Sequence, residues 1–493
     1  MNRLLTSLCA IAGAMLVACN CPKQEIDPTD GCPFDMPAVA RPVIPDNDVC
    51  ITDFGGVADG QTLNTEAFAK AMKHVSDMGG GRIIVPSGVW LTGPIQFESN
   101  CELHVENGAL VLFTNDFDAY PEVTTIFEGI TSTRKMAPLW AYEKENVAIT
   151  GEGAFDGQGQ FWRPSKRSKF TDNQWRALTS GKGIEHKNVW YPDAKADTLA
   201  GRPEMPDFRR VLGRPVLVEF TRCNKVLFRD CTFSNSPAWN VHPLMCEDIT
   251  LEHLNIRNPW FAQNGDGLDL ESCNRAIIYD CTFDVGDDAI CIKAGKDKEG
   301  RDWKRPCQNV VVRDCTVLHG HGGFVIESEM SSGAENIWVH NCLFNGTDTG
   351  LRLKSTRGRG GVVKNIYVDK INMYNIAGDA FTFDLYYANK PAAGKADGDT
   401  SAADEVPQVS EETPCFKDLY ISDITCSGAA RAIWFNGLPE MPLDNLQLSN
   451  SLFVCRRGCE MHYAKNIKFS GVVIKNTEGE AITYADVVDF VNE

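Results

Sequence analysis

The decapeptide NKVLFRDCTF, residues 224–233, decides the fold because its pattern recurs along the second half of the chain. Apolar residues favour its third, fifth, eighth and tenth positions, so the alternation slips once in the middle. Such a pattern predicts two short strands joined by a bend. The further copies start at residues 247, 274, 308, 335, 364, 417, 444 and 465. Repetition at intervals of this size predicts a solenoid, here a parallel β-helix in an all-β chain.

The eighth position of the repeat carries a run of cysteines. The residues at this position include Cys231, Leu254, Cys281, Cys315, Cys342 and Ile371. Because the position faces the core, we expect these cysteines to be stacked free thiols that act as small apolar side chains. The alternative is a set of disulfides between neighbouring coils, which an exported chain with 19 cysteines would permit.

Residues 46–493 are predicted to form a single β-helix domain with a short helix over its first coil. A helix is expected to begin with Asn64 or Thr65 as its N-cap. Its apolar face comprises Ala67, Phe68, Ala71, Met72 and Val75. A solenoid leaves an open core at its end, and a short amphipathic helix closes it. Two stretches that break the repeat, near residues 158–206 and 388–415, are interpreted as insertions.

The first residues predict export. Arg3 is followed by an uncharged run, residues 4–18, which is too short to span a bilayer but has the length of a signal peptide. The run ends in LVAC, which resembles the bacterial lipobox and makes Cys19 the site of lipid attachment. We therefore expect a signal peptide over residues 1–18, a membrane-anchored tether over residues 19–45, and a bacterial lipoprotein that faces the periplasm or the outer cell surface. A plain cleaved signal peptide is the alternative.

The formal net charge of −18 narrows the classes of partner. Proteins that bind nucleic acid carry a basic surface, so this balance argues against nucleic acid. A polyanionic substrate would need a local basic site to overcome the general field of the protein.

A second alignment brings polar residues together on consecutive coils. The strands that follow four of the decapeptides read NGDGLDLES from residue 264, GDDAICIKA from 286, GHGGFVIES from 320 and DTGLRLKS from 348. Equivalent positions on neighbouring coils of a parallel β-helix lie ~4.8 Å apart. Asp266 should therefore lie beside Asp288, and His321 beside Asp287. Glycines around these residues predict a bend, which lets Asp287 and Asp288 face the same cleft.

Carboxylates crowded in this way repel one another. At least one of Asp266, Asp287 and Asp288 should therefore have a raised pKa and hold a proton near neutral pH. One protonated acid beside one ionised base is the pair of groups that glycoside hydrolysis needs.

In this order of motifs the chain resembles glycoside hydrolase family 28, the polygalacturonases and rhamnogalacturonan hydrolases. Their signature is N-T-D, G-D-D, G-H-G and R-I-K, and this chain has NGD at 264–266, GDD at 286–288, GHG at 320–322 and RLK at 352–354. The likeness also includes NSPAWNVHP from residue 235 and GEGAFDGQG from residue 151, so that it extends over roughly residues 50–475. The stretches HGGFVIESEMSSG and RLKSTRGRGG are most similar to exo-acting bacterial members.

The resemblance implies a right-handed parallel β-helix, a monomer, and an inverting hydrolase of α-linked galacturonate bonds that uses neither cofactor nor metal. Asp287 would be the general acid, with His321 tuning it. Asp266 and Asp288 would hold and deprotonate the attacking water. The side chains expected to bind the pectic substrate are Arg352, Lys354, Asn264, His242, Asn235 and Lys293, of which the first two would bind a sugar carboxylate.

The chain departs from the family pattern at two positions. Gly265 replaces the threonine of N-T-D, which leaves the carboxylate of Asp266 in place. Glu327 stands where a small residue is usual, between Lys293 and Lys354 in the alignment, and would neutralise part of the anion site. For Asn235 and His242, packing of the loop is as good an interpretation as contact with substrate.

Two other functions stay open at this point. A pectate lyase can share the fold, but it relies on calcium and a basic residue rather than on paired carboxylic acids. A non-catalytic glycan-binding β-helix would have no reason to keep all three aspartates. Within the hydrolase interpretation, the insertions predict attack at chain ends, and the sequence does not distinguish homogalacturonan from rhamnogalacturonan.

Overall fold

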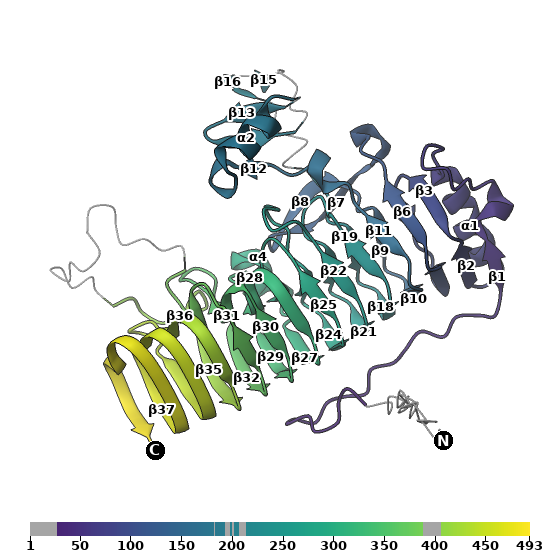
Figure 1. Ribbon diagram of the computed structural model, residues 1–493. Helices are drawn as coiled ribbons and strands as arrows, with labels where there is room; N and C mark the ends of the chain where they lie inside the picture. Colours follow the sequence, from purple (N-terminus) through teal and green to yellow (C-terminus); the bar gives the residue numbers. More distant parts are fainter. Residues whose placement is uncertain (1–26, 182, 193–197, 200–201, 207–212, 388–405) are drawn as a thin grey trace, which may run out of the picture.

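The computed structural model describes residues 27–181, 183–192, 198–199, 202–206, 213–387 and 406–493. The chain winds into a right-handed parallel β-helix whose coils follow one another along a single axis (Figure 1). One complete coil consists of β23 (Leu268–Glu271), β24 (Asn274–Tyr279) and β25 (Thr282–Asp284). Each of these strands pairs in parallel with its counterpart on the next coil, as the repeated decapeptide predicts.

Three parallel sheets run along the solenoid. The first sheet contains β4 (Ile95–Gln96), β9 (Leu139–Tyr142), β17 (Val218–Thr221), β20 (Val241–Leu244), β23, β26 (Ile290–Lys293), β28 (Thr316–Ile326), β31 (Thr347–Lys354), β34 (Asp379–Asp384) and β36 (Thr425–Asn436). The second contains β1 (Asp48–Cys50), β2 (Gly81–Val85), β5 (Cys101–Val105), β10 (Glu145–Thr150), β18 (Asn224–Arg229), β21 (Glu247–Glu252), β24, β27 (Cys307–Arg313), β29 (Ala334–His340), β32 (Val362–Asp369), β35 (Cys415–Ser422) and β37 (Leu443–Asn492). The third contains β3 (Gly88–Thr92), β6 (Ala109–Phe113), β11 (Ala154–Asp156), β19 (Thr232–Ser234), β22 (Asn255–Arg257), β25, β30 (Leu343–Asn345) and β33 (Asn372–Tyr374). The long strands β28 and β36 belong to both the third and the first sheet, and β37 also pairs with β36 in these two sheets.

The cysteines of the repeat are buried in the core as free thiols, as predicted. Cys231, Cys281, Cys315 and Cys342 are almost fully buried, and none of the described cysteines forms a disulfide. A second column of buried thiols, which the decapeptide alignment overlooks, lies just before the strands of the second sheet. It consists of Cys223, Cys246, Cys273 and Cys307, which strand register brings to equivalent places on consecutive coils.

The helix predicted over the first coil is α1 (Thr65–Asp77), and all five residues of its predicted apolar face are buried. Its N-cap residue is Asn64, but the side chain of Asn64 forms no bond to the first turn of the helix. The amide oxygen instead accepts a hydrogen bond from Val57 N at 2.7 Å, and the amide nitrogen donates to Leu91 O at 3.1 Å. The predicted cap therefore holds the loop before the helix against β3.

Several segments outside the repeated coils form structure of their own. The insertion expected near residues 158–206 contains α2 (Asp172–Thr179), a small antiparallel sheet of β12 (Ser165–Lys166), β14 (Val189–Tyr191) and β13 (Ile184–His186), and the pair β15 (Thr198–Leu199) and β16 (Arg202–Pro206) (Figure 1). A hairpin of β7 (Glu122–Phe127) and β8 (Ile130–Lys135) was not foreseen from sequence. The short helix α4 (Asp297–Trp303) directly follows β26. Of the second expected insertion, residues 388–405 lie outside the described part.

The described part of the expected N-terminal tether lies along the outside of the solenoid (Figure 1). Arg41 pairs with Glu252 of β21, with both guanidinium nitrogens bound at 2.8 and 2.6 Å. Farther along the axis, the ring of Phe34 lies 5.8 Å from that of Tyr367 on β32. The predicted signal peptide and Cys19 lie outside the described residues. Among the helices of the described residues, none is long and apolar enough to cross a membrane.

Candidate active site

The polar motifs meet on the outer side of the first sheet, where β23, β26, β28 and β31 lie next to one another. The backbone register confirms the predicted pairs. Gly267 N donates to Asp288 O at 3.0 Å, so that Asp266 and Asp288 lie on adjacent coils at the same height. His321 N donates to Asp287 O at 2.9 Å. Three carboxylates and one imidazole thus come from three consecutive coils.

The chain bends at Gly286 and Asp287, as the glycines there predict, and the charges of both Asp287 and Asp288 act on His321. The backbone N–H of Asp288 donates to Asp287 Oδ1 at 3.2 Å, so the Asp287 side chain folds back over its own chain. Asp287 keeps 24% of its side-chain surface exposed, whereas Asp288 is buried. Of these two aspartates, Asp287 is therefore the one that an incoming molecule reaches first.

Asp288 is held as a carboxylate by two cations of β31. Lys354 Nζ lies 2.9 Å from Asp288 Oδ2, and Arg352 Nη1 lies 3.4 Å from Asp288 Oδ1. Burial alone would raise the pKa of Asp288, but the charges of Lys354 and Arg352 outweigh burial and hold the pKa well below its ordinary range. The two residues expected to bind the substrate carboxylate are thus already in contact with a carboxylate of the protein.

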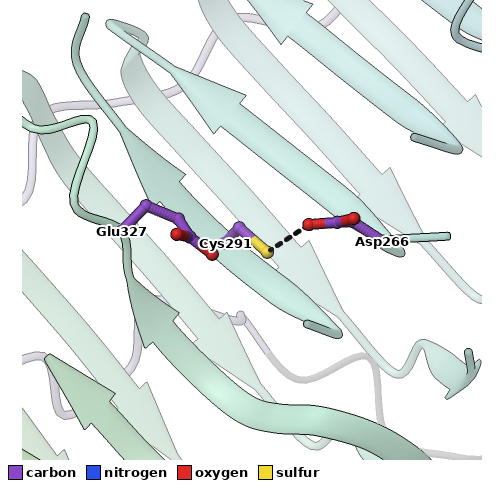
Figure 2. Close-up of side chains that lie close together, drawn as sticks. All are labelled: Asp266, Cys291 and Glu327. Atoms are coloured by element: carbon purple, nitrogen blue, oxygen red, sulfur yellow. Dashed lines mark hydrogen bonds between the residues drawn. The ribbon is translucent and has the colours of Figure 1, made fainter. Parts of the chain in front are cut away.

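Asp266 has the opposite environment. Burial, followed by the charges of Asp287 and Asp269, raises the pKa of Asp266 well above its usual value. Figure 2 shows the thiol of Cys291 pointing at Asp266, with Sγ 3.9 Å from Oδ2, and Glu327 on the far side of the thiol. The other oxygen of Asp266 is buried without a hydrogen-bond partner among the described residues. The raised carboxyl pKa expected for this cluster thus falls on Asp266.

His321 is bound directly to Asp287. His321 Nδ1 lies 3.0 Å from Asp287 Oδ1, and this contact raises the pKa of His321. The other ring nitrogen, Nε2, lies 3.4 Å from Lys169 Nζ and 3.8 Å from Asp348 Oδ2. A protonated His321 provides a proton next to the carboxyl group of Asp287.

Glu327 lies between the two lysines, as the alignment predicts. Its carboxylate is 2.9 Å from Lys354 Nζ and 3.9 Å from Lys293 Nζ. Burial raises the pKa of Glu327, which the two lysines limit to about 7. Near neutral pH Glu327 is therefore partly protonated and partly ionised. Its ionised form neutralises part of the positive charge of Lys354.

Lys293 and His242, which were expected to bind substrate, are both buried and paired with carboxylates. Lys293 is buried, 3.4 Å from Asp269 and 4.3 Å from the ring centroid of Trp239. His242 has no exposed surface, and its Nε2 lies 3.0 Å from Glu271. Neither side chain lines an open cleft, because both lie within the packed layer on the outer side of the first sheet.

The cover over this layer includes the unforeseen hairpin. Phe127 at the end of β7 stacks on Trp239 at a centroid distance of 4.3 Å, and Thr125 bonds to Glu219. Glu219 lies beside His242 in strand register. The hairpin therefore covers Glu219 and His242. The alternation of apolar and polar residues in the strands predicts only that these side chains lie on the outer side of the sheet.

The two expected asparagines are both bound by arginines from outside the motifs. Asn264 Oδ1 accepts from Arg214 Nη2 at 2.6 Å, and Asn235 Oδ1 accepts from Arg163 Nη2 at 2.8 Å. Asn235 also donates to Asp156 at 3.0 Å, which agrees with the loop-packing interpretation. Burial lowers the pKa of Arg214 to about 10, against the opposing charges of Asp266 and Asp287 among others. No sequence signal marked either arginine, because both belong to segments without a repeat.

Asp266, Cys291 and Glu327 offer donor atoms that all lie within 4.8 Å of one another. Their chemistry does not fit a divalent cation well. Burial raises the pKa of the Cys291 thiol and of Asp266, and Glu327 is already bound by Lys354 at 2.9 Å. Metal ligands must be deprotonated and are opposed by an adjacent ammonium. We interpret the group as hydrogen-bonded side chains that surround Asp266.

Fold and site together define a class of protein, a parallel β-helix with three aspartates and a histidine on consecutive coils. The sequence model described as "Glycosyl hydrolases family 28" matches residues 210–406. The crystal structure of a hyperthermoactive exopolygalacturonase from Thermotoga maritima is similar, with a TM-score of 0.73 and 31% sequence identity. The match covers 89% of this chain and 94% of that one. The chain belongs to glycosyl hydrolase family 28.

Two curated relatives are similar over shorter parts of their length. A probable polygalacturonase of Vitis vinifera is 30% identical over 333 residues, which are 66% of this chain and 60% of the relative. An exo-poly-alpha-D-galacturonosidase of Dickeya chrysanthemi is 28% identical over 351 residues, 69% of this chain and 57% of the relative. The chain thus spans less than two thirds of either relative.

Proposed function

We propose that this protein is an inverting glycoside hydrolase that cleaves α-linked galacturonate bonds in pectin. The proposal rests on one observation: three neighbouring aspartates lie in different electrostatic environments. Lys354 and Arg352 keep Asp288 ionised, burial favours the protonated form of Asp266, and Asp287 is exposed beside His321. A cleft that holds ionised and proton-carrying groups side by side meets the requirement of glycoside hydrolysis.

In the proposed reaction, Asp287 gives its proton to the glycosidic oxygen as the bond to the anomeric carbon breaks. Water held by Asp266 and Asp288 attacks that carbon from the opposite face, and Asp288 accepts the proton that the water releases. Asp288 then releases its proton to solvent, and His321 passes a proton taken up from solvent to Asp287 through the contact of 3.0 Å. A reaction by direct attack of water inverts the anomeric configuration.

We also propose attack at chain ends. The insertion brings Lys169 to the catalytic histidine, and such an added wall favours a pocket over a groove that is open at both ends. The Thermotoga and Dickeya relatives are named as exo-acting enzymes. Viscometry tests this proposal, since a steep fall in viscosity after cleavage of very few bonds would show mid-chain attack instead.

Export as a lipid-anchored monomer, on the periplasmic or the outer face of a bacterial membrane, completes the proposal. Its support is the LVAC motif that ends at Cys19. A Cys19→Ala variant should lose its association with membranes, and fractionation of cells that produce it would measure this. Recovery of that variant in the membrane fraction at the wild-type level would contradict the proposal.

The proposed activity is tested by chromatography of the products from homogalacturonan and from rhamnogalacturonan fragments. Saturated galacturonate products with new reducing ends are expected. Products that absorb as unsaturated uronides would instead identify a lyase. Binding of the polymer without any release of reducing sugar would identify a glycan-binding protein.

A further inference from the structure

The insertion docks on the site through a short aromatic contact. Phe170, just before α2, packs on Phe261 at a ring-centroid distance of 5.0 Å. Phe261 belongs to the loop that leads into the NGD motif. Arg167 fixes the turn before Phe170 by donating to the Phe170 carbonyl at 2.7 Å. Lys169, the residue just before Phe170, is thereby held against His321 with a separation of 3.4 Å between Nζ and Nε2.

Lys169 differs from Lys354, Arg352 and Lys293 because no ion pair with a carboxylate is found for it among the described residues. Lys354 and Arg352 contact Asp288, and Lys293 contacts Asp269. Within the described ranges, no carboxylate oxygen lies inside the 4.0 Å ion-pair distance of the Lys169 ammonium.

Two carboxylates near Lys169 are already engaged by His321. Asp287 lies 3.0 Å and Asp348 lies 3.8 Å from a ring nitrogen of His321. Lys169 is half-buried, so its ammonium is held in place yet reachable from solvent. An anionic ligand that reaches Lys169 therefore meets a cation with which, among the described residues, no aspartate competes at ion-pair distance.

Trp260 stands next to this cation. Its side chain is exposed over 53% of its surface, which is unusual for so large an apolar group. Lys169 Nζ lies 5.9 Å from the Trp260 ring centroid, and the Trp260 ring meets Phe261 edge to face at 5.7 Å. A largely exposed indole ring beside a cation matches a sugar acid, which has an apolar C–H face and a carboxylate.

We propose that Lys169 and Trp260 form a uronate-binding subsite on the His321 side of the catalytic aspartates. The subsite is distinct from the one that Arg352 and Lys354 would provide, and it is built by the insertion rather than by the coils. Lys169 binds the carboxylate of one galacturonate residue while Trp260 stacks on the ring of that sugar. This inference rests on the proposed function and names a second point at which the substrate charge is recognised.

The test measures binding separately from turnover. In the Asp287→Asn variant, short oligogalacturonides are expected to bind without being hydrolysed. Calorimetry then compares their affinity for this variant with their affinity for the double variant that also carries Lys169→Gln. One charge-assisted contact is worth on the order of a tenfold change in affinity. We expect Lys169→Gln to weaken binding by about that factor and Lys169→Arg to restore most of it. Lys166→Gln, at an exposed lysine three residues earlier, is the matched control and should leave the affinity unchanged.

A second ligand isolates the carboxylate. The same oligosaccharide in methyl-esterified form has no charge for Lys169 to bind, so Lys169→Gln should change its affinity little. Equal weakening for the charged and the esterified ligand would overturn the proposal. So would an unchanged affinity together with a lower turnover and a shifted pH profile, because Lys169 would then act on His321 rather than on substrate.

Trp260→Ala checks the second half of the subsite and should weaken both ligands, since stacking does not depend on charge. An unchanged affinity for both ligands would show that Trp260 is not part of the subsite.

Experiments on the wild-type protein distinguish failure of this inference from failure of the proposed function. If it hydrolyses oligogalacturonides while Lys169→Gln binds them normally, only the subsite is wrong. If the wild type neither binds nor cleaves them, the proposed function fails as well.

Discussion

Replacing Lys354 with methionine should destabilise the protein in a way that depends on pH. The ammonium of Lys354 lies 2.9 Å from both Asp288 and Glu327, and all three side chains are buried. Methionine keeps most of the volume but leaves Arg352, at 3.4 Å, as the cation that still pairs with Asp288 among the described residues. Glu327, whose pKa is about 7, can take up a proton at little cost, so most of the penalty comes from Asp288.

The size of the penalty follows from the cost of an incompletely paired buried charge. Removing one partner of a buried ion pair typically costs about 3–5 kcal/mol, and the remaining arginine should bring the loss to roughly 2–3 kcal/mol near pH 7. Without Lys354, burial raises the pKa of Asp288 in the folded state above its unfolded value of about 3.9. A carboxyl group with a raised folded pKa costs stability only above its unfolded pKa. The difference between variant and wild type should therefore grow as the pH rises from about 4 to 7.

Chemical denaturation of both proteins at pH 4.5 and pH 7 measures this difference. Lys364→Met is the control, because Lys364 makes a comparable contact of 2.7 Å with Glu335 on the partly exposed surface. Such surface pairs contribute about 0–1 kcal/mol, with little change over this range of pH. A Lys354→Met penalty no larger than that of the control, or equal at both pH values, would refute the ion-pair account of Asp288.

Three further outcomes test separate parts of the structure. Asp287→Asn should lower turnover by ~10²–10⁴-fold while leaving the melting temperature nearly unchanged, and steady-state kinetics that retain more than about a tenth of wild-type turnover would reject the general-acid role. Cys291→Ala removes the thiol that contacts Asp266 and should lower kcat by roughly 2–10-fold with little change in KM, whereas Cys291→Ser should largely recover it. An equal loss in both Cys291 variants would mean that packing, not hydrogen bonding, matters there. Thiol labelling of the native protein should leave four cysteines unmodified, whereas labelling after denaturation without reductant should reach them. These four are Cys231, Cys281, Cys315 and Cys342. Detection of a disulfide among them by mass spectrometry would contradict the interpretation that they are free thiols stacked in the core.

The parts of the site that repeat from coil to coil were predictable from sequence. Alternation of apolar residues fixes strand register, because a slip by one residue would turn the whole apolar set outward. The sequence alignment pairs Leu268 with Ile290, Phe324 and Leu351, and the structure has the same strand register. That register places Asp266 beside Asp288 and Asp287 beside His321 without any knowledge of the loops.

The parts that do not repeat were not predictable. Alternation identifies the outer side of a strand, but it does not reveal what covers that side. Lys293 and His242 were expected to bind substrate, but both lie in a layer that the β7–β8 hairpin covers by stacking Phe127 on Trp239. The hairpin could not be foreseen because it belongs to a segment outside the repeat. Lys169 reaches His321 only because an insertion docks through Phe170 and Phe261, a tertiary contact with no periodic signature.

The most direct test of the proposed chemistry is proton NMR of an oligogalacturonide during the first turnovers. If water attacks directly while Asp287 protonates the leaving oxygen, the β-anomer must appear first from an α-linked substrate, and mutarotation produces the α-anomer only later. We predict the β-anomer first. Initial appearance of the α-anomer would require a covalent intermediate and would contradict the assignment of Asp266, Asp287 and Asp288.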